Sequence, residues 1–194
     1  MGKGVEARPP LDTILSGTWV ALRPVFPRDF DFLYDLAMDE ANFGWRYGGS
    51  VLTREAYVAQ LWPGVLCQFL VVARKSNRPI GLVVAYNADL HLGRTYVGGV
   101  SIPQVQRSGL MNEAFRLMIN YLRATWEIRK LYFEFAEYNL AQFASGLSRW
   151  LRMEARLKGH VYFDGRYWDQ YIYSLDTTIE PAAIRLREDS TSVD

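Results

Sequence analysis

The chain has 194 residues, of which 49% are hydrophobic and 14% aromatic, enough for one folded domain with a full core. Its 22 basic and 21 acidic residues give a net charge of +1, which excludes a general attraction to nucleic acid or to anionic membranes and leaves only local charged sites. Cys67 is the single cysteine beside two histidines, so an internal disulfide and a histidine–cysteine metal cluster are excluded as well.

The ends of the chain differ in composition from its middle. The first ten residues lack the apolar core of a signal peptide, and no run reaches the roughly 18 apolar residues that a membrane helix requires. We therefore expect a cytoplasmic protein without a membrane partner. We also expect an N-terminal extension over residues 1–16, one domain over 17–176 and a flexible tail over 177–194.

The N-terminal third is typical of one strand followed by two helices. Alternating apolar residues predict a strand over 18–25, and Pro27-Arg28-Asp29 opens a helix with one apolar face. An irregular, aromatic loop follows over residues 42–50. A second helix is expected from about residue 53 to residue 61.

The middle of the chain predicts three strands and then the longest helix. Apolar, β-rich runs over 67–75, 79–86 and 95–102 are separated by polar turn residues, as in consecutive hairpins. From residue 108 to about residue 126 the apolar positions recur at helical spacing. This segment is expected to bury one face against the strands.

The C-terminal part predicts a strand over 131–136, a helix over 141–151 and two further strands over 154–163 and 167–175. The last two strands flank Asp164-Gly165, a strong signal for a hairpin turn. The predicted element order is therefore β-α-α-β-β-β-α-β-α-β-β.

The segment from Ser101 to Ala114 contains the most informative motif. It runs from a strand through Pro103 into a short basic turn and then directly into the long helix. Backbone N–H groups without partners at a helix start, together with the helix dipole, attract phosphate. Gly109 permits close approach of the backbone, and Arg107 adds a positive charge. The pattern predicts an anion site, with an ordinary strand-to-helix connection as the alternative.

The element order and this turn resemble the GNAT superfamily of acyl-CoA-dependent N-acyltransferases over about residues 18–175. The likeness is greatest to the branch with the ribosomal-protein alanine N-acetyltransferases and many small-molecule acetyltransferases. Their turn, Arg/Gln-x-x-Gly-x-Gly/Ala followed by Thr-Glu-Ala, is matched by residues 106–114, and their later asparagine by Asn139. Their Glu-Gly-x-Leu-Arg-x-His element and the following Asp-Gly-Arg-Tyr are matched by residues 154–160 and 164–167.

The resemblance implies an α/β (α+β) fold with a mixed, mostly antiparallel seven-stranded sheet flanked by about four helices. It also implies acetyl-CoA, or another acyl-CoA, as co-substrate and no metal. The residues implied to hold the co-substrate are Val100, Ser101 and Ile102 at the strand end, Gln106, Arg107, Ser108, Gly109, Leu110, Met111 and Asn112 at the turn and helix start, and Asn139.

Two positions depart from the family's pattern. Met111 stands where relatives carry the second small residue of the turn, so its side chain would crowd a pyrophosphate unless it points away. Gly146 stands where many relatives carry the tyrosine that protonates the departing thiolate. The first departure concerns binding of the co-substrate, and the second concerns the general acid.

Within the family an amine attacks the thioester directly, so the enzyme must accept a proton from the ammonium and return one to the thiolate. For the base, Glu134 at the end of the strand over 131–136 is the first candidate and Glu137 the second. For the acid, the candidates are Tyr138 and Ser145, which lie near Asn139 and the following helix. Purely structural roles are the alternative for each of these residues.

Three functions remain open at this point. The leading hypothesis is an acetyl-CoA-dependent N-acetyltransferase acting on the primary amine of a small molecule, with Trp45 and Tyr47 in contact with that substrate. The second hypothesis is an acetyltransferase that modifies a protein N-terminus or a lysine. The third is a non-catalytic acyl-CoA-binding interaction module. A longer acyl donor and a homodimer also remain open, whereas a nucleic-acid partner is not expected.

Overall fold

The computed structural model describes residues 13–42, 50–140 and 151–178. Its helices are α1 (Phe30–Met38), α2 (Arg54–Ala59) and α3 (Leu110–Thr125), with short 3-10 turns η1 (Pro27–Asp29), η2 (Glu40–Asn42), η3 (Pro103–Val105) and η4 (Glu137–Asn139). Its strands are β1 (Leu15–Ser16), β2 (Val20–Arg23), β3 (Val65–Ala73), β4 (Arg78–Asp89), β5 (Arg94–Ser101), β6 (Lys130–Ala136), β7 (Arg152–Phe163) and β8 (Arg166–Asp176).

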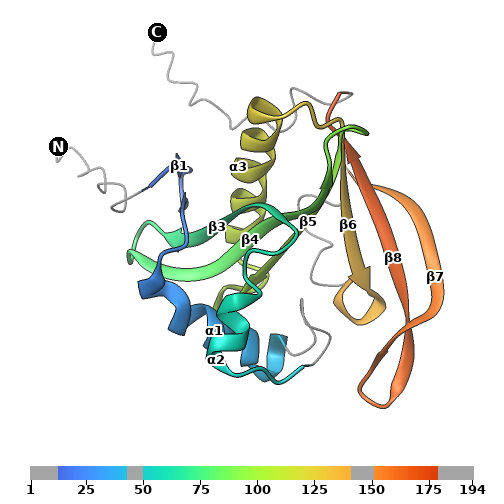
Figure 1. The fold of residues 1–194 in the computed structure, drawn as a ribbon, viewed down its shortest axis with the longest axis horizontal. Coiled ribbons are helices and arrows are strands. Elements are labelled where there is room, and N and C mark those ends of the chain that lie inside the picture. The colour runs from blue at the N-terminus through green and yellow to red at the C-terminus, as the bar shows by residue number, and fades with distance from the viewer. Residues whose placement is uncertain (1–12, 43–49, 141–150, 179–194) are drawn as a thin grey trace, which may run out of the picture.

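The described strands form one eight-stranded sheet in the order β1-β2-β3-β4-β5-β6-β8-β7 (Figure 1). Neighbouring strands are antiparallel except β5 and β6, which are parallel. The mixed, mostly antiparallel α/β class predicted from the sequence is thus confirmed. The sheet has one strand more than expected, because Leu15–Ser16 pairs with β2 as a short edge strand. The helix expected over 141–151 lies, except for its last residue, outside the described residues.

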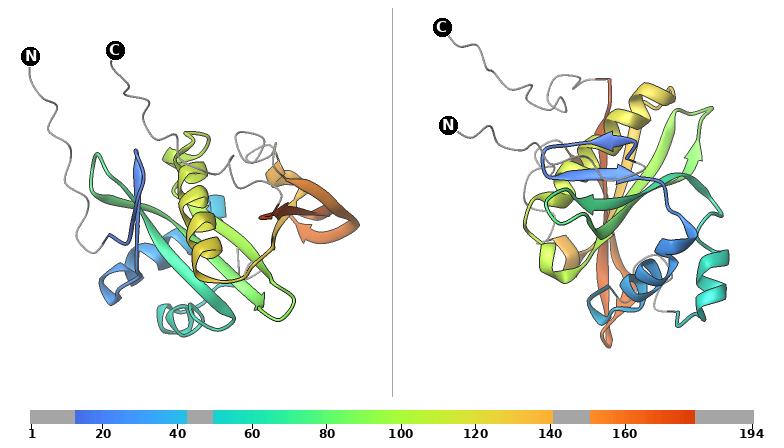
Figure 2. Two further views of the ribbon diagram at one scale, coloured as in Figure 1. Left: turned by 90° about the horizontal axis from the view of Figure 1, so that it is seen from above. Right: turned by 90° about the vertical axis from the view of Figure 1, so that its left-hand side faces the viewer.

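Helices cover both faces of the sheet (Figure 2). α3 packs on one face, and its buried side chains include Ala114, Leu117, Met118 and Leu122, as the helical spacing predicts. α1 and α2 pack on the other face, where Leu33, Leu36, Ala37, Tyr57 and Leu61 join Leu70, Leu82 and Val100 of the strands. Because β5 is covered from both sides, the strand is held firmly at the centre of the fold.

The strand β4 is longer than expected and contains a bulge. Tyr86 lies opposite Tyr96 of β5, but the next pair is Asp89 with Arg94, so β4 contains one extra residue. Asn87 at this bulge has a φ of 48°, a left-handed conformation that non-glycine residues seldom adopt. Such bulges redirect side chains near the end of a strand, and this one lies at the edge of the cavity described below.

A buried ion pair connects the first strands to the first helix. Arg23 and Asp29 are joined by two hydrogen bonds of 2.7 Å, from Nη1 to Oδ2 and from Nη2 to Oδ1, and both residues are buried. Asp29 also accepts the N–H of Phe26 at 2.9 Å. Burial acts to raise the pKa of Asp29, but these hydrogen bonds and the Arg23 charge outweigh it and hold the pKa below its usual 3.8.

Acid is therefore expected to weaken the fold through this carboxyl group. A carboxyl whose pKa is lower in the folded state contributes stability that is complete above its unfolded pKa and is lost as the pH falls through the folded pKa. We expect the urea unfolding midpoint to decrease below about pH 4. In Asp29→Asn this part of the acid dependence should disappear, while the variant is less stable at pH 7 because Arg23 has lost its partner. Parallel acid dependence in both proteins would contradict this prediction.

Candidate functional site

The cavity of the protein opens where the two parallel strands separate. β5 and β6 pair only through Arg94–Lys130, Thr95–Leu131 and Tyr96–Tyr132, and beyond these residues they diverge (Figure 1). A cavity of about 700 Å³ lies between the two diverging strands. Its walls include Val97 to Ser101 of β5, Glu134 to Ala136 of β6, the start of α3 and the loop before β3. The edge of β5 that faces the cavity thus leaves backbone groups available to a ligand in extended form.

Two adjacent glycines let other elements approach β5 closely at the cavity. A Cβ atom at Gly99 would lie 2.8 Å from Cζ of Phe115, so only glycine admits this ring of α3. On the opposite face, a Cβ at Gly98 would lie 3.6 Å from Cε1 of Tyr86, which is ordinary contact. The ring of Tyr86 therefore lies against β5 beside the point where the strand separates from β6.

The turn before α3 has the geometry of an anion cradle. Arg107 and Gly109 have φ values of 62° and 84°, and the Ser108 hydroxyl donates to the Val105 carbonyl at 2.6 Å and accepts the Leu110 N–H at 3.3 Å. Within the described residues, the N–H groups of Arg107, Gly109 and Met111 have no hydrogen-bond acceptor. Successive N–H groups in alternating right- and left-handed conformations form a concave anion site, and the helix dipole adds to it.

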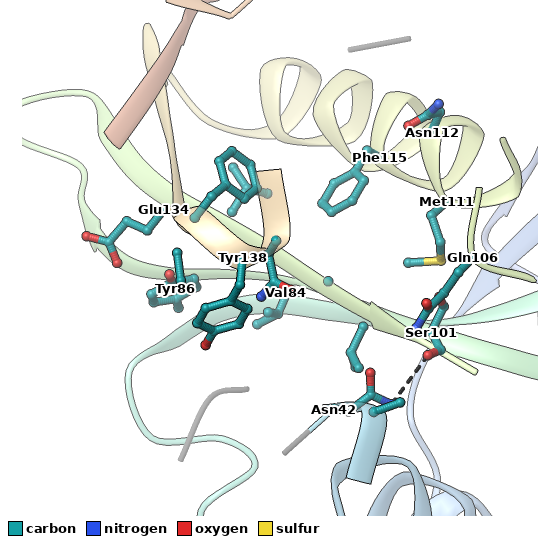
Figure 3. A pocket seen from close by; sticks show the side chains of 18 of the residues that line it. Asn42, Val84, Tyr86, Ser101, Gln106, Met111, Asn112, Phe115, Glu134 and Tyr138 are labelled. Atoms are coloured by element: carbon teal, nitrogen blue, oxygen red, sulfur yellow. Dashed lines mark hydrogen bonds between the residues drawn. The ribbon is translucent and has the colours of Figure 1, made fainter. Parts of the chain in front are cut away.

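The space over this cradle is open. No atom lies within 4 Å of the position that a Cβ would take at Gly109, so a phosphate can approach the backbone there. Met111 does not fill the space, because its side chain points toward the sheet (Figure 3), and its Sδ would lie 3.3 Å from a Cβ at Gly81. The side chain that departs from the family's pattern thus packs against β4 and leaves the N–H groups of the turn accessible.

The structure brings most of the residues expected to hold the co-substrate to one cavity. Those that line it are Val100, Ser101, Gln106, Arg107, Gly109, Met111, Asn112 and Asn139. The other three residues lie close to the cavity and have structural roles. Ile102 donates its N–H to the Ile80 carbonyl at 2.9 Å and packs against the core, Ser108 closes the turn, and Leu110 packs against the core.

Glu134 lies at the opposite end of the cavity from this turn (Figure 3). Glu134 is an exposed residue, but partial desolvation still raises the pKa of its carboxyl, and the nearby charge of His160 opposes this rise. A raised pKa brings a carboxylate closer to the range in which it exchanges protons at neutral pH. Glu137, the second candidate for the base, is exposed and does not line the cavity.

Tyr138 lines the same end of the cavity and is held by aromatic rings. Its ring stacks on Phe163 with 4.7 Å between centroids and meets the edge of Trp168 at 5.4 Å. Trp168 is fixed in turn, because its Nε1–H donates to the Phe163 carbonyl at 2.9 Å and the Arg166 guanidinium lies 3.4 Å from its ring centroid. Burial raises the pKa of the Tyr138 hydroxyl, and at neutral pH this group is protonated and can donate a proton.

Three sequence candidates, Trp45, Tyr47 and Ser145, lie outside the described residues. The polar cavity residues Tyr86, Asn87 and Gln170 are among those that the sequence did not single out. Two of them lie at or beside the β4 bulge, and the third is in β8 opposite Ala136. A polar residue such as Asn87 directly after an apolar strand was the only available signal, and it indicated a turn and no more.

Two searches of the described residues gave negative results. No group of three or more His, Cys, Asp and Glu residues in the described ranges could hold a metal ion. Among the helices described, none is long and apolar enough to cross a membrane. Cys67 is partly buried, and desolvation raises the pKa of its thiol to about 11, so this thiol is not an activated nucleophile.

The chain is similar to known acetyltransferases in sequence and in structure. Residues 20–144 match the model of the acetyltransferase (GNAT) domain family. The structure is similar to spermidine N-acetyltransferase from Vibrio cholerae in complex with CoA and spermine, with a TM-score of 0.73 at 17% identity over 84% of this chain and 98% of that one. It is also similar to a GCN5-related N-acetyltransferase from Brucella melitensis, with a TM-score of 0.70 at 21% identity over 91% and 84% of the two chains. A GNAT-family acetyltransferase from Bacillus anthracis gives a TM-score of 0.70 at 16% identity over 84% and 98%. No curated protein matches the sequence.

Proposed function

The chain belongs to the GNAT acetyltransferase family, and from this premise we propose that it transfers the acetyl group of acetyl-CoA to the primary amine of a small molecule. Family membership makes the protein an acyltransferase. The choice of acetyl-CoA as donor and of a small amine as acceptor is our proposal. The observation that supports it is one continuous cavity with a cradle of backbone N–H groups at one end and a carboxylate at the other.

The residues present fit an acyl-CoA. The cradle of Arg107, Gly109 and Met111 offers N–H groups and a positive charge to the pyrophosphate. The unpaired edge of β5 beyond Tyr96 offers N–H and carbonyl groups to the pantetheine arm, which has amide groups of its own. Asn139 lines the cavity and is placed to contact the same arm. When bound, acetyl-CoA supplies an acyl group activated as a thioester.

We assign proton transfer to two side chains at the far end of the cavity. The Glu134 carboxylate accepts a proton from the incoming ammonium, directly or through water, so that the neutral amine can attack. The Tyr138 hydroxyl, which like an ordinary tyrosine is protonated at neutral pH, donates a proton to the departing sulfur. β5 holds the donor in line with the amine, which removes the entropy cost of bringing the two reactants together.

The walls of the cavity favour a small acceptor over a protein. The far end is bounded by residues of four separate elements: Pro63 and Gly64 before β3, Tyr86 of β4, Glu134 of β6 and Gln170 of β8. A peptide chain requires a groove that is open at both ends, and we take the convergence of these elements as favouring a small acceptor. The Vibrio cholerae relative was solved with CoA and spermine, which supports small amines as acceptors in this fold. A cytoplasmic location, where acetyl-CoA is available, belongs to the same proposal.

Substitution of Gly109 tests the cradle. Gly109→Ala adds a methyl group in the space reserved for phosphate and forces an L-residue to a φ of 84°. Such a left-handed conformation costs about 1–2 kcal/mol for alanine. By isothermal titration calorimetry we expect the dissociation constant of acetyl-CoA to increase about tenfold or more.

The matched control is Gly165→Ala. Gly165 has a φ of 75° and no atom within 4 Å of its Cβ position, but it lies in the β7–β8 turn, outside the set of cavity-lining residues. This variant should be strained to a similar degree and bind acetyl-CoA like the wild type. If neither the wild type nor the control binds acetyl-CoA, the proposed function is wrong. If Gly109→Ala binds as tightly as the control, the cradle is not the phosphate site.

A further inference from the structure

The far end of the cavity combines one charge with several neutral polar groups. We define the far end by the lining residues Tyr86, Asn87, Glu134, Tyr138 and Gln170. Figure 3 shows Tyr86, Glu134 and Tyr138 together, well separated from Met111 and Gln106 near the turn. The groups presented here are one carboxylate, two phenol rings with hydroxyls and two carboxamides. Their chemistry gives information about the acceptor, provided that the proposed function is correct.

The β4 bulge fixes the position of one of these carboxamides. The N–H of Asn87 donates to the Gly64 carbonyl at 2.8 Å, and Oδ1 of Asn87 would lie 3.4 Å from a Cβ at Gly64. The left-handed φ of Asn87 is therefore maintained by the loop before β3, and its side chain lies at the cavity wall.

The charges around the cavity are few. Among the described residues that line it, Glu134 is the only carboxylate, and Arg107 at the opposite end is the only basic residue. The segments 43–49 and 141–150, which continue the chain from the lining residues Asn42 and Asn139, contain no Asp or Glu in their sequences. Glu134 can therefore neutralise one ammonium group, and the cavity lining offers no carboxylate for a second.

The aromatic rings at the far end do not replace a second carboxylate. A ring face binds an ammonium by cation–π attraction when that face is accessible. The ring of Tyr138 is stacked on Phe163 and touches Trp168, and the ring of Tyr86 packs beside Tyr96 with 5.7 Å between centroids. Each ring thus already packs against a neighbouring ring, and a carboxylate is the stronger partner for an ammonium at this end of the cavity.

We propose that the acceptor is a monoamine whose primary amino group is flanked by hydroxyl or amide groups, and that Asn87 and Gln170 determine this specificity. Glu134 receives the amine, while the two carboxamides bind the neutral polar groups beside it. A polyamine, the acceptor suggested by the Vibrio cholerae relative, is disfavoured because its second ammonium group finds no carboxylate among the described lining residues. A hydrocarbon amine is disfavoured because it makes no hydrogen bonds with the Asn87 and Gln170 carboxamides.

The test compares matched acceptors with the full-length protein. CoA release from acetyl-CoA is measured with glucosamine, with cyclohexylamine as a ring of similar size without hydroxyls, and with spermidine as the polyamine. Values of kcat/KM are expressed per total amine at one pH, because Glu134 is proposed to receive each acceptor in its ammonium form. We expect glucosamine to exceed both other amines by about tenfold or more.

Two variants assign the preference to the proposed residues. Asn87→Gly removes the carboxamide but tolerates the left-handed φ, and Gln170→Met keeps the length of the side chain. We expect each to lower the ratio of kcat/KM for glucosamine over cyclohexylamine about fivefold to tenfold, the effect of one lost hydrogen bond. Asn77→Gly is the matched control, since Asn77 has a φ of 54° in the exposed β3–β4 turn and should leave the ratio unchanged.

The possible outcomes separate this inference from the proposed function. Equal or faster turnover of spermidine or cyclohexylamine overturns the inference and leaves the acetyltransferase intact. A ratio that neither variant changes likewise overturns the assignment to Asn87 and Gln170. Acetyl-CoA binding by calorimetry without turnover of any amine overturns both proposals, and absence of acetyl-CoA binding overturns the proposed function first.

Discussion

Replacing Glu134 with glutamine is expected to lower kcat for amine acetylation by about 100-fold or more, the typical contribution of a positioned general base. The glutamine side chain would keep the size and polarity of the original but could not accept a proton from the ammonium. Binding of acetyl-CoA should be unchanged, because the cradle at Arg107 and Gly109 lies at the opposite end of the cavity. Steady-state kinetics and calorimetry on the same preparation separate these two effects.

The pH dependence of the wild type provides an independent check on Glu134. The base works as a carboxylate, and desolvation raises its pKa above the usual 4.5. As the pH falls through this raised pKa the carboxylate is protonated, so kcat should decrease on the acid side at a pH above 4.5. The positive charge of His160 acts in the opposite direction, because it lowers the pKa of Glu134. A His160→Gln variant should therefore move the acid limb to higher pH.

Glu137→Gln is the matched control for the base, since Glu137 lies three residues further along the chain, is exposed and does not line the cavity. It should retain wild-type kcat. If Glu137→Gln loses activity and Glu134→Gln does not, the second candidate from the sequence is the base. If both variants remain fully active, protons leave the amine through solvent, and neither carboxylate has a catalytic role.

Replacing Glu113 with alanine is expected to cause the largest loss of stability. This carboxylate is 4% exposed and accepts the N–H groups of Thr18, Trp19 and Val20 at 2.7, 2.8 and 2.9 Å. It thereby anchors the turn between β1 and β2 to α3. Gly17 is part of this arrangement, because a Cβ there would lie 2.7 Å from Cδ of Glu113.

The loss follows from donors left without an acceptor. Unsatisfied buried N–H groups cost about 1–3 kcal/mol, and we expect about 3 kcal/mol in total for Glu113→Ala. In a domain of this size that corresponds to a decrease in Tm of roughly 10 °C, which differential scanning calorimetry can measure. Glu127→Ala is the control, because Glu127 is exposed beyond the end of α3. A decrease no larger than that of the control would show that the three hydrogen bonds contribute little.

Local sequence patterns predicted the helix α3, the last hairpin and the turn at Gly109, because the signal for each lies within a few neighbouring residues. The spacing of Ala114, Met118 and Leu122 in α3 follows directly from a period of 3.6 residues, and the structure buries those positions. Asp164 and Gly165 adopt φ values of 51° and 75° in the last hairpin, as their residue types predict. The position of Gly109, with a left-handed φ at the start of α3, was likewise readable, since glycine is the residue that adopts this conformation without strain.

Other features arise from contacts between distant parts of the chain, and no local pattern encodes them. The direction of Met111 depends on the space above Gly81, a residue of another strand. The role of Glu113 depends on three N–H groups more than 90 residues away. The bulge at Asn87 is visible only through its pairing with β5, because a register shift is a property of two strands.

The sequence by itself determined most of the order of helices and strands, because their periodicity is continuous in the chain. Through its family resemblance it also predicted the class of fold, an anion-binding turn between Gln106 and Met111, and proton-transfer candidates that included Glu134 and Tyr138. Only the tertiary structure decided that β5 and β6 separate after Tyr96 and that the turn and Glu134 lie at opposite ends of one cavity. It also placed Tyr86, Asn87 and Gln170 around Glu134. The physical reason is that the cavity forms where β5 and β6 stop pairing. The pairing of strands is fixed by the packing of the whole sheet and not by local sequence.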